Sequence, residues 1–228
     1  SKDNLLKLLT WLSPSFPVGA YSYSHGIEFA VEENLVNDAK TLRNWVEGIL
    51  YYGAGQKDGI VFSETWKTIN KADENRLLYV IEIANAFQPT TEMALESRAQ
   101  GAAFLDAISA AWPLEQLTHV TRLLKKNSDY VSYPVAVGIV AAVHLVSLSD
   151  ALSAYLNAFS MNLVSAGVRL IPIGQTEGLQ IMAGLTKCII AIQEIVLRSS
   201  LKDLAATSLI VDWTSACHET QHTRLFRS

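Results

Sequence analysis

Apolar residues recur along most of the chain at the three- and four-residue spacing of amphipathic helices. One clear example follows Asp38, a candidate N-cap, where Leu42, Val46 and Ile49 fall on a single face. Pro113 suits the first turn of a later helix, which then runs to about Lys126. Comparable stretches cover about residues 56–70, 73–87, 91–111, 134–147, 150–170 and 176–200. Because convincing period-two alternation is missing, the pattern predicts an all-α fold.

The predicted helices are joined by short connections, and no Ser/Gly-rich linker or fixed-period repeat divides the chain. We therefore expect one domain over residues 1–228, a single bundle of roughly nine to ten helices. Two stretches break the helical pattern. The first is an irregular N-terminal loop, which we take as residues 13–20 together with residues 21–28 that follow them. The second is a flexible, polar C-terminal tail within residues 202–228. Apolar residues in such a tail usually await a partner, so we expect this tail to bind one.

Composition narrows the function classes. The chain has 228 residues, a net charge of −4 and no basic block longer than Lys125-Lys126, which argues against nucleic acid as a partner. Its longest near-continuous apolar run, residues 134–146, is shorter than the roughly 20 residues of a membrane span. The N-terminus lacks the apolar core of a signal peptide, and the two cysteines have no CxxC spacing. These features predict a cytoplasmic protein that does not enter a membrane.

The sequence contains no strong catalytic signature. The glycine-rich stretch at residues 53–59 follows a helix rather than a strand, so it does not predict a phosphate-binding loop. No P-loop motif occurs, and Ser24 beside His25 lacks the surrounding G-x-S-x-G pattern. A helical, metal-independent enzyme stays an alternative, but no motif supports it. We expect a protein that is not an enzyme.

A metal site is the second chemical possibility. His218 and His222 are four residues apart, so both would lie on one face if the tail were helical, and Cys217 is adjacent. Without a carboxylate anchor, these residues define no closed site, and a solvated polar tail is the favoured explanation. Both interpretations stay open at this point.

Three stretches together resemble the signatures of the urease accessory protein F family. They are residues 13–28 (SPSFPVGAYSYSHGIE), residues 169–176 (RLIPIGQT) and residues 218–228 (HETQHTRLFRS). They occur in the family's order, and the resemblance spans nearly the whole chain. Two positions depart from the pattern: Ala20 replaces a second glycine, and His222 stands where tyrosine is commoner.

The resemblance implies an all-helical, non-catalytic protein that helps to load nickel into urease. Members of the family bind accessory protein D, called H in some organisms, and this complex recruits the GTPase accessory protein G. The resemblance further implies a homodimer that meets the urease apoprotein within the complex and that gates or stimulates GTP hydrolysis. It implies no cofactor of the chain's own, since nickel is handled by the complex and GTP is bound by the partner. The alternative is a metallochaperone that binds nickel directly through His218, His222 and Cys217.

Within this resemblance the irregular stretches supply the expected site residues. In the N-terminal loop, the candidates for contact with the GTPase or a second subunit are Phe16, Pro17, Tyr21, Tyr23, His25 and Glu28. In the tail, the candidates for docking accessory protein D/H are His218, Glu219, Gln221, Arg224, Leu225, Phe226 and Arg227. Arg169 and Gln175 are possible residues facing the GTPase nucleotide.

Overall fold

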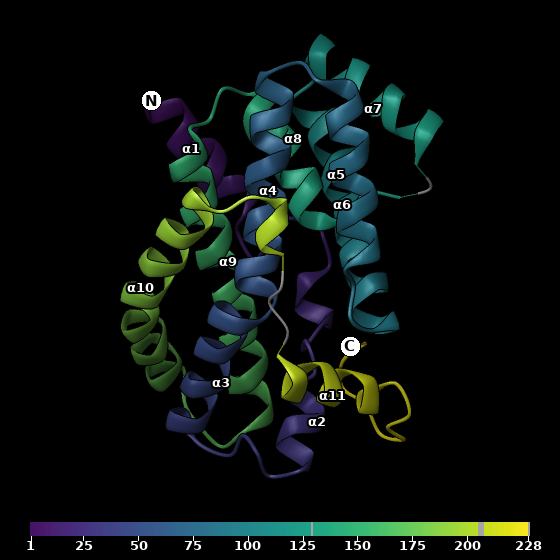
Figure 1. The fold of residues 1–228 in the computed structure, drawn as a ribbon. Coiled ribbons are helices and arrows are strands. Elements are labelled where there is room, and N and C mark those ends of the chain that lie inside the picture. Colours follow the sequence, from purple (N-terminus) through teal and green to yellow (C-terminus); the bar gives the residue numbers. More distant parts are fainter. Residues whose placement is uncertain (129, 205–207, 228) are drawn as a thin grey trace.

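A computed structural model describes residues 1–128, 130–204 and 208–227 of the chain (Figure 1). These residues contain no strand, so the all-α prediction is confirmed. Their helices follow the order α1 (Lys2–Trp11), η1 (Ala20–Ser22), α2 (Ile27–Glu32), α3 (Ala39–Tyr52), α4 (Ala54–Asn70), α5 (Glu74–Ala86), α6 (Thr91–Ala111), α7 (Glu115–Asn127), α8 (Tyr133–Val143), α9 (Leu148–Leu170), α10 (Gln175–Arg198), η2 (Leu201–Asp203) and α11 (Leu209–His218).

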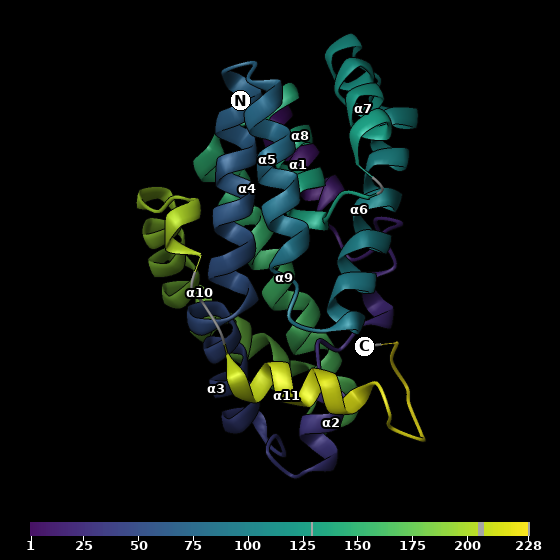
Figure 2. The same ribbon diagram turned by 45° about the vertical axis from the view of Figure 1, so that its right-hand side comes forward.

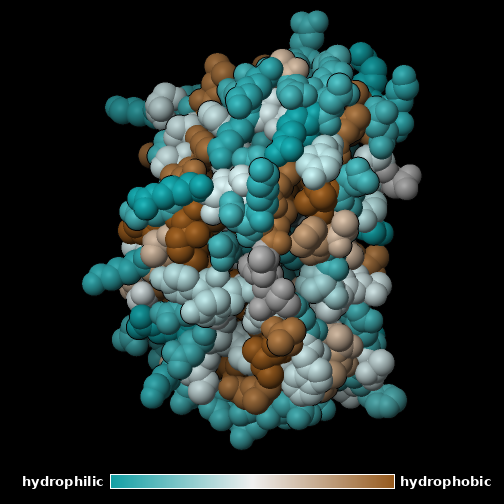
Figure 3. Space-filling model, viewed as in Figure 1, coloured by the Kyte–Doolittle hydropathy of each residue, from teal (hydrophilic) through white to brown (hydrophobic). Residues whose placement is uncertain are grey.

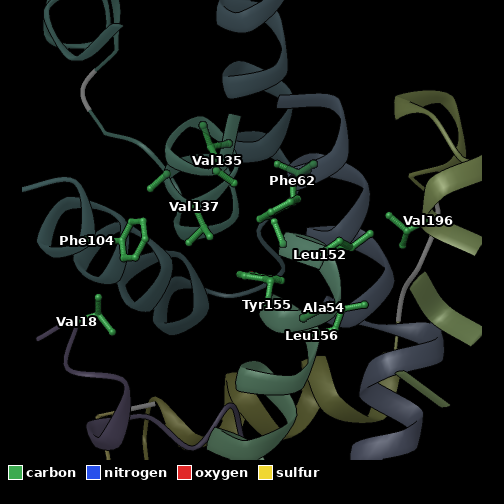
Figure 4. Close-up of a cluster of buried hydrophobic side chains, with 14 of the residues drawn as sticks. Val18, Ala54, Phe62, Phe104, Val135, Val137, Leu152, Tyr155, Leu156 and Val196 are labelled. Carbon is green, nitrogen blue, oxygen red and sulfur yellow. The ribbon is translucent and has the colours of Figure 1, made fainter. Parts of the chain in front are cut away.

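Helix α8 lies at the centre of the bundle. Every residue from Pro134 to Val143 is buried, because α4 packs along one side of this helix and α6 along another. Helix α9 closes the core, where Phe62 of α4 and Tyr155 of α9 lie beside the valines of α8 (Figure 4). The apolar run that sequence analysis read as a buried helix therefore forms the core of the domain.

Helix α10 packs outside this core, against α3, α4 and α9. By length and composition alone it could cross a membrane, but its inner face is buried against those three helices. Near the foot of the molecule, α11 crosses the ends of α2 and α6, and the chain then turns back on itself (Figure 2). The C-terminal tail thus returns to the N-terminal loop.

The helix boundaries follow local chemistry closely. Asp38 caps α3 as predicted, with its Oδ1 accepting a hydrogen bond from Thr41 N at 2.7 Å. Pro113 does not lie in the first turn of α7 as expected, because α7 begins at Glu115 and Leu114 occupies the N-cap.

The glycine-rich stretch at residues 53–59 forms the start of α4, and a Cβ on Gly55 would lie 2.6 Å from Leu50 Cα. Close packing of α3 and α4 therefore explains why a glycine occupies this position, and no bound phosphate is needed to explain it.

Candidate functional site

The three stretches that carry the family resemblance meet at one end of the bundle. The tail runs back over the N-terminal loop, and Arg227 N donates a hydrogen bond to Ser22 O at 2.8 Å. Arg169, near the end of α9, reaches the same place and donates from its guanidinium to Tyr21 O at 2.8 Å. Segments about 150 to 200 residues apart in sequence therefore form one site.

Glu28 in the first turn of α2 is the main anchor of the tail. Its carboxylate accepts hydrogen bonds from Leu225 N at 2.6 Å and from Phe226 N at 2.9 Å. The same group lies 3.0 Å from Nε2 of His218. Since the Glu28 side chain is only 9% exposed, these contacts are made largely out of water, where charge-assisted hydrogen bonds are strong.

His218, the last residue of α11, is fully buried between two carboxylates. Its Nδ1 lies 2.7 Å from Glu92 of α6, on the opposite side of the ring from Glu28. Each ring nitrogen therefore has a carboxylate as its neighbour. Arg224 completes the network, because its Nη1 donates to the other oxygen of Glu92 at 2.8 Å. A charged network thus ties α2, α6, α11 and the tail together.

A stacked cluster of side chains forms the second link between loop and tail. The guanidinium of Arg169 lies 3.7 Å from the ring centroid of Tyr21 and 4.2 Å from that of Phe226. Cations in this arrangement are attracted to aromatic faces. Phe226 is 4% exposed, so its ring is buried by the chain's own residues. We call this arrangement, in which Arg169 lies against both Tyr21 and Phe226, the Arg169 clamp.

Close backbone packing makes this arrangement possible. Gly26 has φ of +79°, and a Cβ there would lie 2.9 Å from both Ser215 N and Thr214 Oγ1 of α11. Any other residue would be strained at this φ and would separate α2 from α11. At the start of α6, Glu219 Oε1 accepts a hydrogen bond from Thr91 N at 3.0 Å, which places a carboxylate at the positive end of that helix.

The structure divides the predicted N-terminal residues into two groups. Tyr21 is 68% exposed and Pro17 is also exposed, whereas Tyr23 is half-buried. Phe16 and His25 are buried inside the bundle, so partner contacts at these two residues stay a prediction that their burial does not favour. Phe16 packs on Phe104 of α6, with ring centroids 5.4 Å apart. Glu28 is also buried, and it binds the tail instead of a separate partner.

The tail residues divide in the same way. Glu219, Arg224, Leu225 and Arg227 are exposed, and Gln221 is half-buried. His218 and Phe226 are buried by the chain's own residues, so partner contacts at these two residues stay a prediction that their burial does not favour. Arg169 is likewise engaged by Tyr21 and Phe226 rather than extended towards a partner's nucleotide. Gln175 is the exposed first residue of α10 and takes no part in this network within the described chain.

The predicted metal ligands do not converge. Both ring nitrogens of His218 face carboxylates, His222 is exposed beyond the end of α11, and Cys217 is half-buried on α11. In residues 1–128, 130–204 and 208–227, no three His, Cys, Asp or Glu side chains form a group that could hold a metal ion. The structure therefore does not bring His218, His222 and Cys217 together, and direct nickel binding through them stays an alternative prediction.

Glu92 is the site residue that sequence reasoning missed. It follows the Thr90 N-cap of α6, where an acidic residue is explained by the helix dipole alone. Its partner His218 lies 126 residues away in sequence. No local pattern could have joined these two residues.

A second polar cluster lies inside the bundle, around a cavity of about 60 Å³. It contains His25, Lys57, Asp58 and Glu96, with Lys57 Nζ 3.9 Å from Asp58 and donating to Phe87 O at 3.2 Å. Burial raises the pKa of Asp58, and the nearby Lys57 ammonium partly opposes that rise.

Comparison with known proteins agrees with this geometry. The UreF family model matches residues 36–186. A urease accessory protein UreF of Rhodopseudomonas palustris strain BisB5 is 44% identical over 225 residues, covering 99% of this chain and 91% of that protein. The UreF of Bradyrhizobium diazoefficiens is 41% identical over 224 residues, covering 98% of this chain and 91% of that protein.

The matched region includes the Arg169 clamp, and the full-length matches include the buried Glu28, Glu92 and His218 as well as the tail. On the family match and this near-complete coverage, the chain belongs to the UreF family.

Proposed function

We propose that this chain is a scaffold in the insertion of nickel into urease, and that it joins accessory protein D/H to the GTPase accessory protein G. Membership of the UreF family carries the accessory role in urease maturation. The site supports a binding function, because its buried charges are used to hold two segments of the chain together. Nickel is then handled by the complex, GTP is bound by the partner, and the chain works in the cytoplasm.

The observation that carries the proposal is the joining of loop and tail into one surface. Tyr21, which lies against Arg169, is 68% exposed, and Leu225, the neighbour of Phe226 in the tail, is 65% exposed. Arg227 is also exposed, and its amide binds Ser22 O next to Tyr21. Aromatic and arginine side chains are common binding hot spots. A partner that binds here contacts residues of the N-terminal motif and of the C-terminal motif at the same time.

Helix α11 adds an apolar face next to this surface. Leu209 is 79% exposed, Ile210 is 48% exposed and Trp213 is 46% exposed. Figure 3 shows the apolar patch on this side of the molecule, at the level of α11. Exposed apolar residues gathered on one helix are typical of a protein interface. We assign this face and Leu225 to accessory protein D/H, and the Tyr21 side of the loop to the GTPase.

Arg169 favours recruitment and gating over direct activation of the GTPase. An arginine that stabilises a transition state must reach the nucleotide of its partner. The guanidinium of Arg169 instead lies between Tyr21 and Phe226 and donates to a backbone carbonyl. We propose that the chain holds the GTPase until the complex has engaged the urease apoprotein.

The complex is proposed to form around a homodimer of this chain. Besides α11, the helices α1 and α10 expose apolar side chains, including Leu5, Leu9, Leu179 and Ile190. These separate faces offer room for a second copy in addition to the two accessory proteins.

Affinity capture with purified accessory proteins tests the proposal. Leu225→Ser should lose capture of D/H, and Tyr21→Ala should lose capture of the GTPase by the chain bound to D/H, while helix content is unchanged. Tyr79→Ala is the matched control, because Tyr79 is also exposed, at 47%, and also carries an arginine, Arg76, over its ring. Normal capture by both site variants would contradict the assignment. In single-turnover GTP hydrolysis, gating predicts a slower rate with the chain bound, and a faster rate would favour activation.

A further inference from the structure

Helix α1 is attached to the bundle by few side chains. Leu8 and Trp11 are its only buried residues, while Leu5, Leu6 and Leu9 are 57% to 64% exposed. Near its start, Asn4 Nδ2 donates to Leu145 O at 2.9 Å. An element with so little buried area is free to open without unfolding the rest of the domain.

The buried end of α1 packs directly on a histidine. The ring centroid of Trp11 lies 5.0 Å from that of His144, the C-cap of α8, and 5.9 Å from that of Trp112. His144 is 8% exposed. Within the described chain, neither Nε2 of His144 nor Nε1 of Trp11 has a hydrogen-bond partner.

This environment suits a neutral imidazole and disfavours an imidazolium. A proton on both ring nitrogens would place a buried charge here and would leave the N–H at Nε2 without an acceptor. Undocking of α1 would bring the ring into water, where either form is solvated. Protonation and undocking are therefore coupled.

We propose that His144 makes the docking of α1 dependent on pH, so that the helix is held at neutral and alkaline pH and released in mild acid. Burial lowers the pKa of His144, and the nearby Lys7 ammonium lowers it further, whereas Asp3 acts in the opposite direction. Lys7 and Asp3 pair with each other at 2.8 Å, which leaves burial as the leading cause.

Within the part of the chain that the structure describes, the charges that shift the pKa of His144 are those of Lys7 and Asp3, both on α1. Helix α4 contributes Trp66, whose indole donates to Val146 O, and the end of α6 contributes Trp112. At the start of α9, the Asp150 carboxylate accepts the hydroxyl of Ser147 at 2.6 Å. The pKa of His144 in the docked state is thus set by burial, by the Lys7 ammonium and by the Asp3 carboxylate.

The direction of the effect follows from linkage. In the undocked state the ring titrates near its ordinary pKa of about 6.5, and in the docked state it titrates lower. Docking is therefore at full strength above pH 6.5. Below it, docking weakens by up to about tenfold for each pH unit, until the docked ring is protonated as well. Release would uncover Leu8 and Trp11 and would open the groove of about 770 Å³ that α1 and α9 line together in the docked state.

Hydrogen–deuterium exchange of the full chain at pH 7.5, 6.5 and 5.5, corrected for the intrinsic chemical rate, tests the proposal. Protection of residues 2–11 should fall by up to about tenfold between pH 6.5 and 5.5, while α4 and α8 stay protected. In His144→Gln the protection of α1 should no longer depend on pH. His119→Gln is the control, because His119 is exposed and paired with Glu74, and it should keep the wild-type response.

Lys7→Gln gives a second measurement if His144→Gln folds poorly. Loss of the Lys7 charge should move the docked ring towards its ordinary pKa and so reduce the response of α1 to pH. The proposal is overturned if α1 keeps its protection at pH 5.5, gains protection there, or loses it equally in His144→Gln.

Discussion

Replacing Glu28 by alanine should release the C-terminal tail while the bundle stays folded. The variant removes the acceptor of the Leu225 and Phe226 amides and one of the two carboxylates that face His218. Helices α4, α8 and α9 make none of these hydrogen bonds, so their packing should not change. The effect should therefore be local.

The size of the effect follows from the burial of the network. Hydrogen bonds to a charged group typically contribute about 1.5–3 kcal/mol each, and Glu28→Ala removes two of them from the tail amides, about 3–6 kcal/mol together. The tail keeps the burial of Phe226, worth about 2 kcal/mol, and its stacking on Arg169. Taking the lower figure of about 3 kcal/mol for the loss, the opening equilibrium should rise on the order of 10²-fold.

Native-state hydrogen exchange of residues 219–227 measures this opening directly. Glu32→Ala is the control, since Glu32 is the same residue type on the same helix but is exposed. The control should exchange like the wild type. Unchanged exchange at Leu225 and Phe226 in Glu28→Ala would refute the reasoning, and so would equal loss of protection across α4, α8 and α9.

Two further predictions concern the interior. Gly101→Ala should lower the free energy of unfolding, measured by denaturant titration, by about 1–3 kcal/mol, since a Cβ there would lie 2.2 Å from Val131 O. Gly48→Ala, where a Cβ meets nothing within 4 Å, should instead stabilise α3 by about 0.5–1 kcal/mol, and equal effects would contradict this account. Asp58→Asn should be more stable than the wild type at pH 7.5, and its advantage should shrink towards pH 4.5 in urea unfolding. The raised pKa means that the folded state binds the Asp58 proton more tightly than the unfolded state, so the wild type gains stability as pH falls, and a constant difference would disprove the assignment.

The fold was predictable because its determinants are local. The spacing of apolar residues located α3 and α10, and Asp38 marked the start of α3 through a contact three residues away. The error at Pro113 is also local, since Leu114 provides the extended backbone that precedes α7. Helix α11 was missed because its exposed face is apolar and its buried face holds Thr214, Ser215 and His218, which reverses the usual pattern.

The site was predictable only as a set of unusual segments. The motifs around Tyr21, Arg169 and Phe226 were identified, but their mutual stacking depends on the path of the whole chain. His218 looked like a solvated residue or a ligand because its two carboxylate partners lie 126 and 190 residues away. Charged residues can be buried when such partners exist, and a single sequence does not show the pairing.

The internal anchoring of the tail has a consequence for affinity. A segment that orders only on binding loses part of its interaction energy to conformational entropy, whereas a segment already held in place loses less. Contacts of the tail with Glu28 and Arg169 offset that loss of entropy before any partner binds.

Glu28→Ala should then weaken capture of accessory protein D/H, although Glu28 itself is buried away from the proposed contact surface. Leu225→Ser should weaken the same capture with tail protection intact, because Leu225 contributes only its amide to the anchor and its side chain is exposed. If Glu28→Ala opens the tail and capture is unaffected, the preorganised tail is not what the partner recognises.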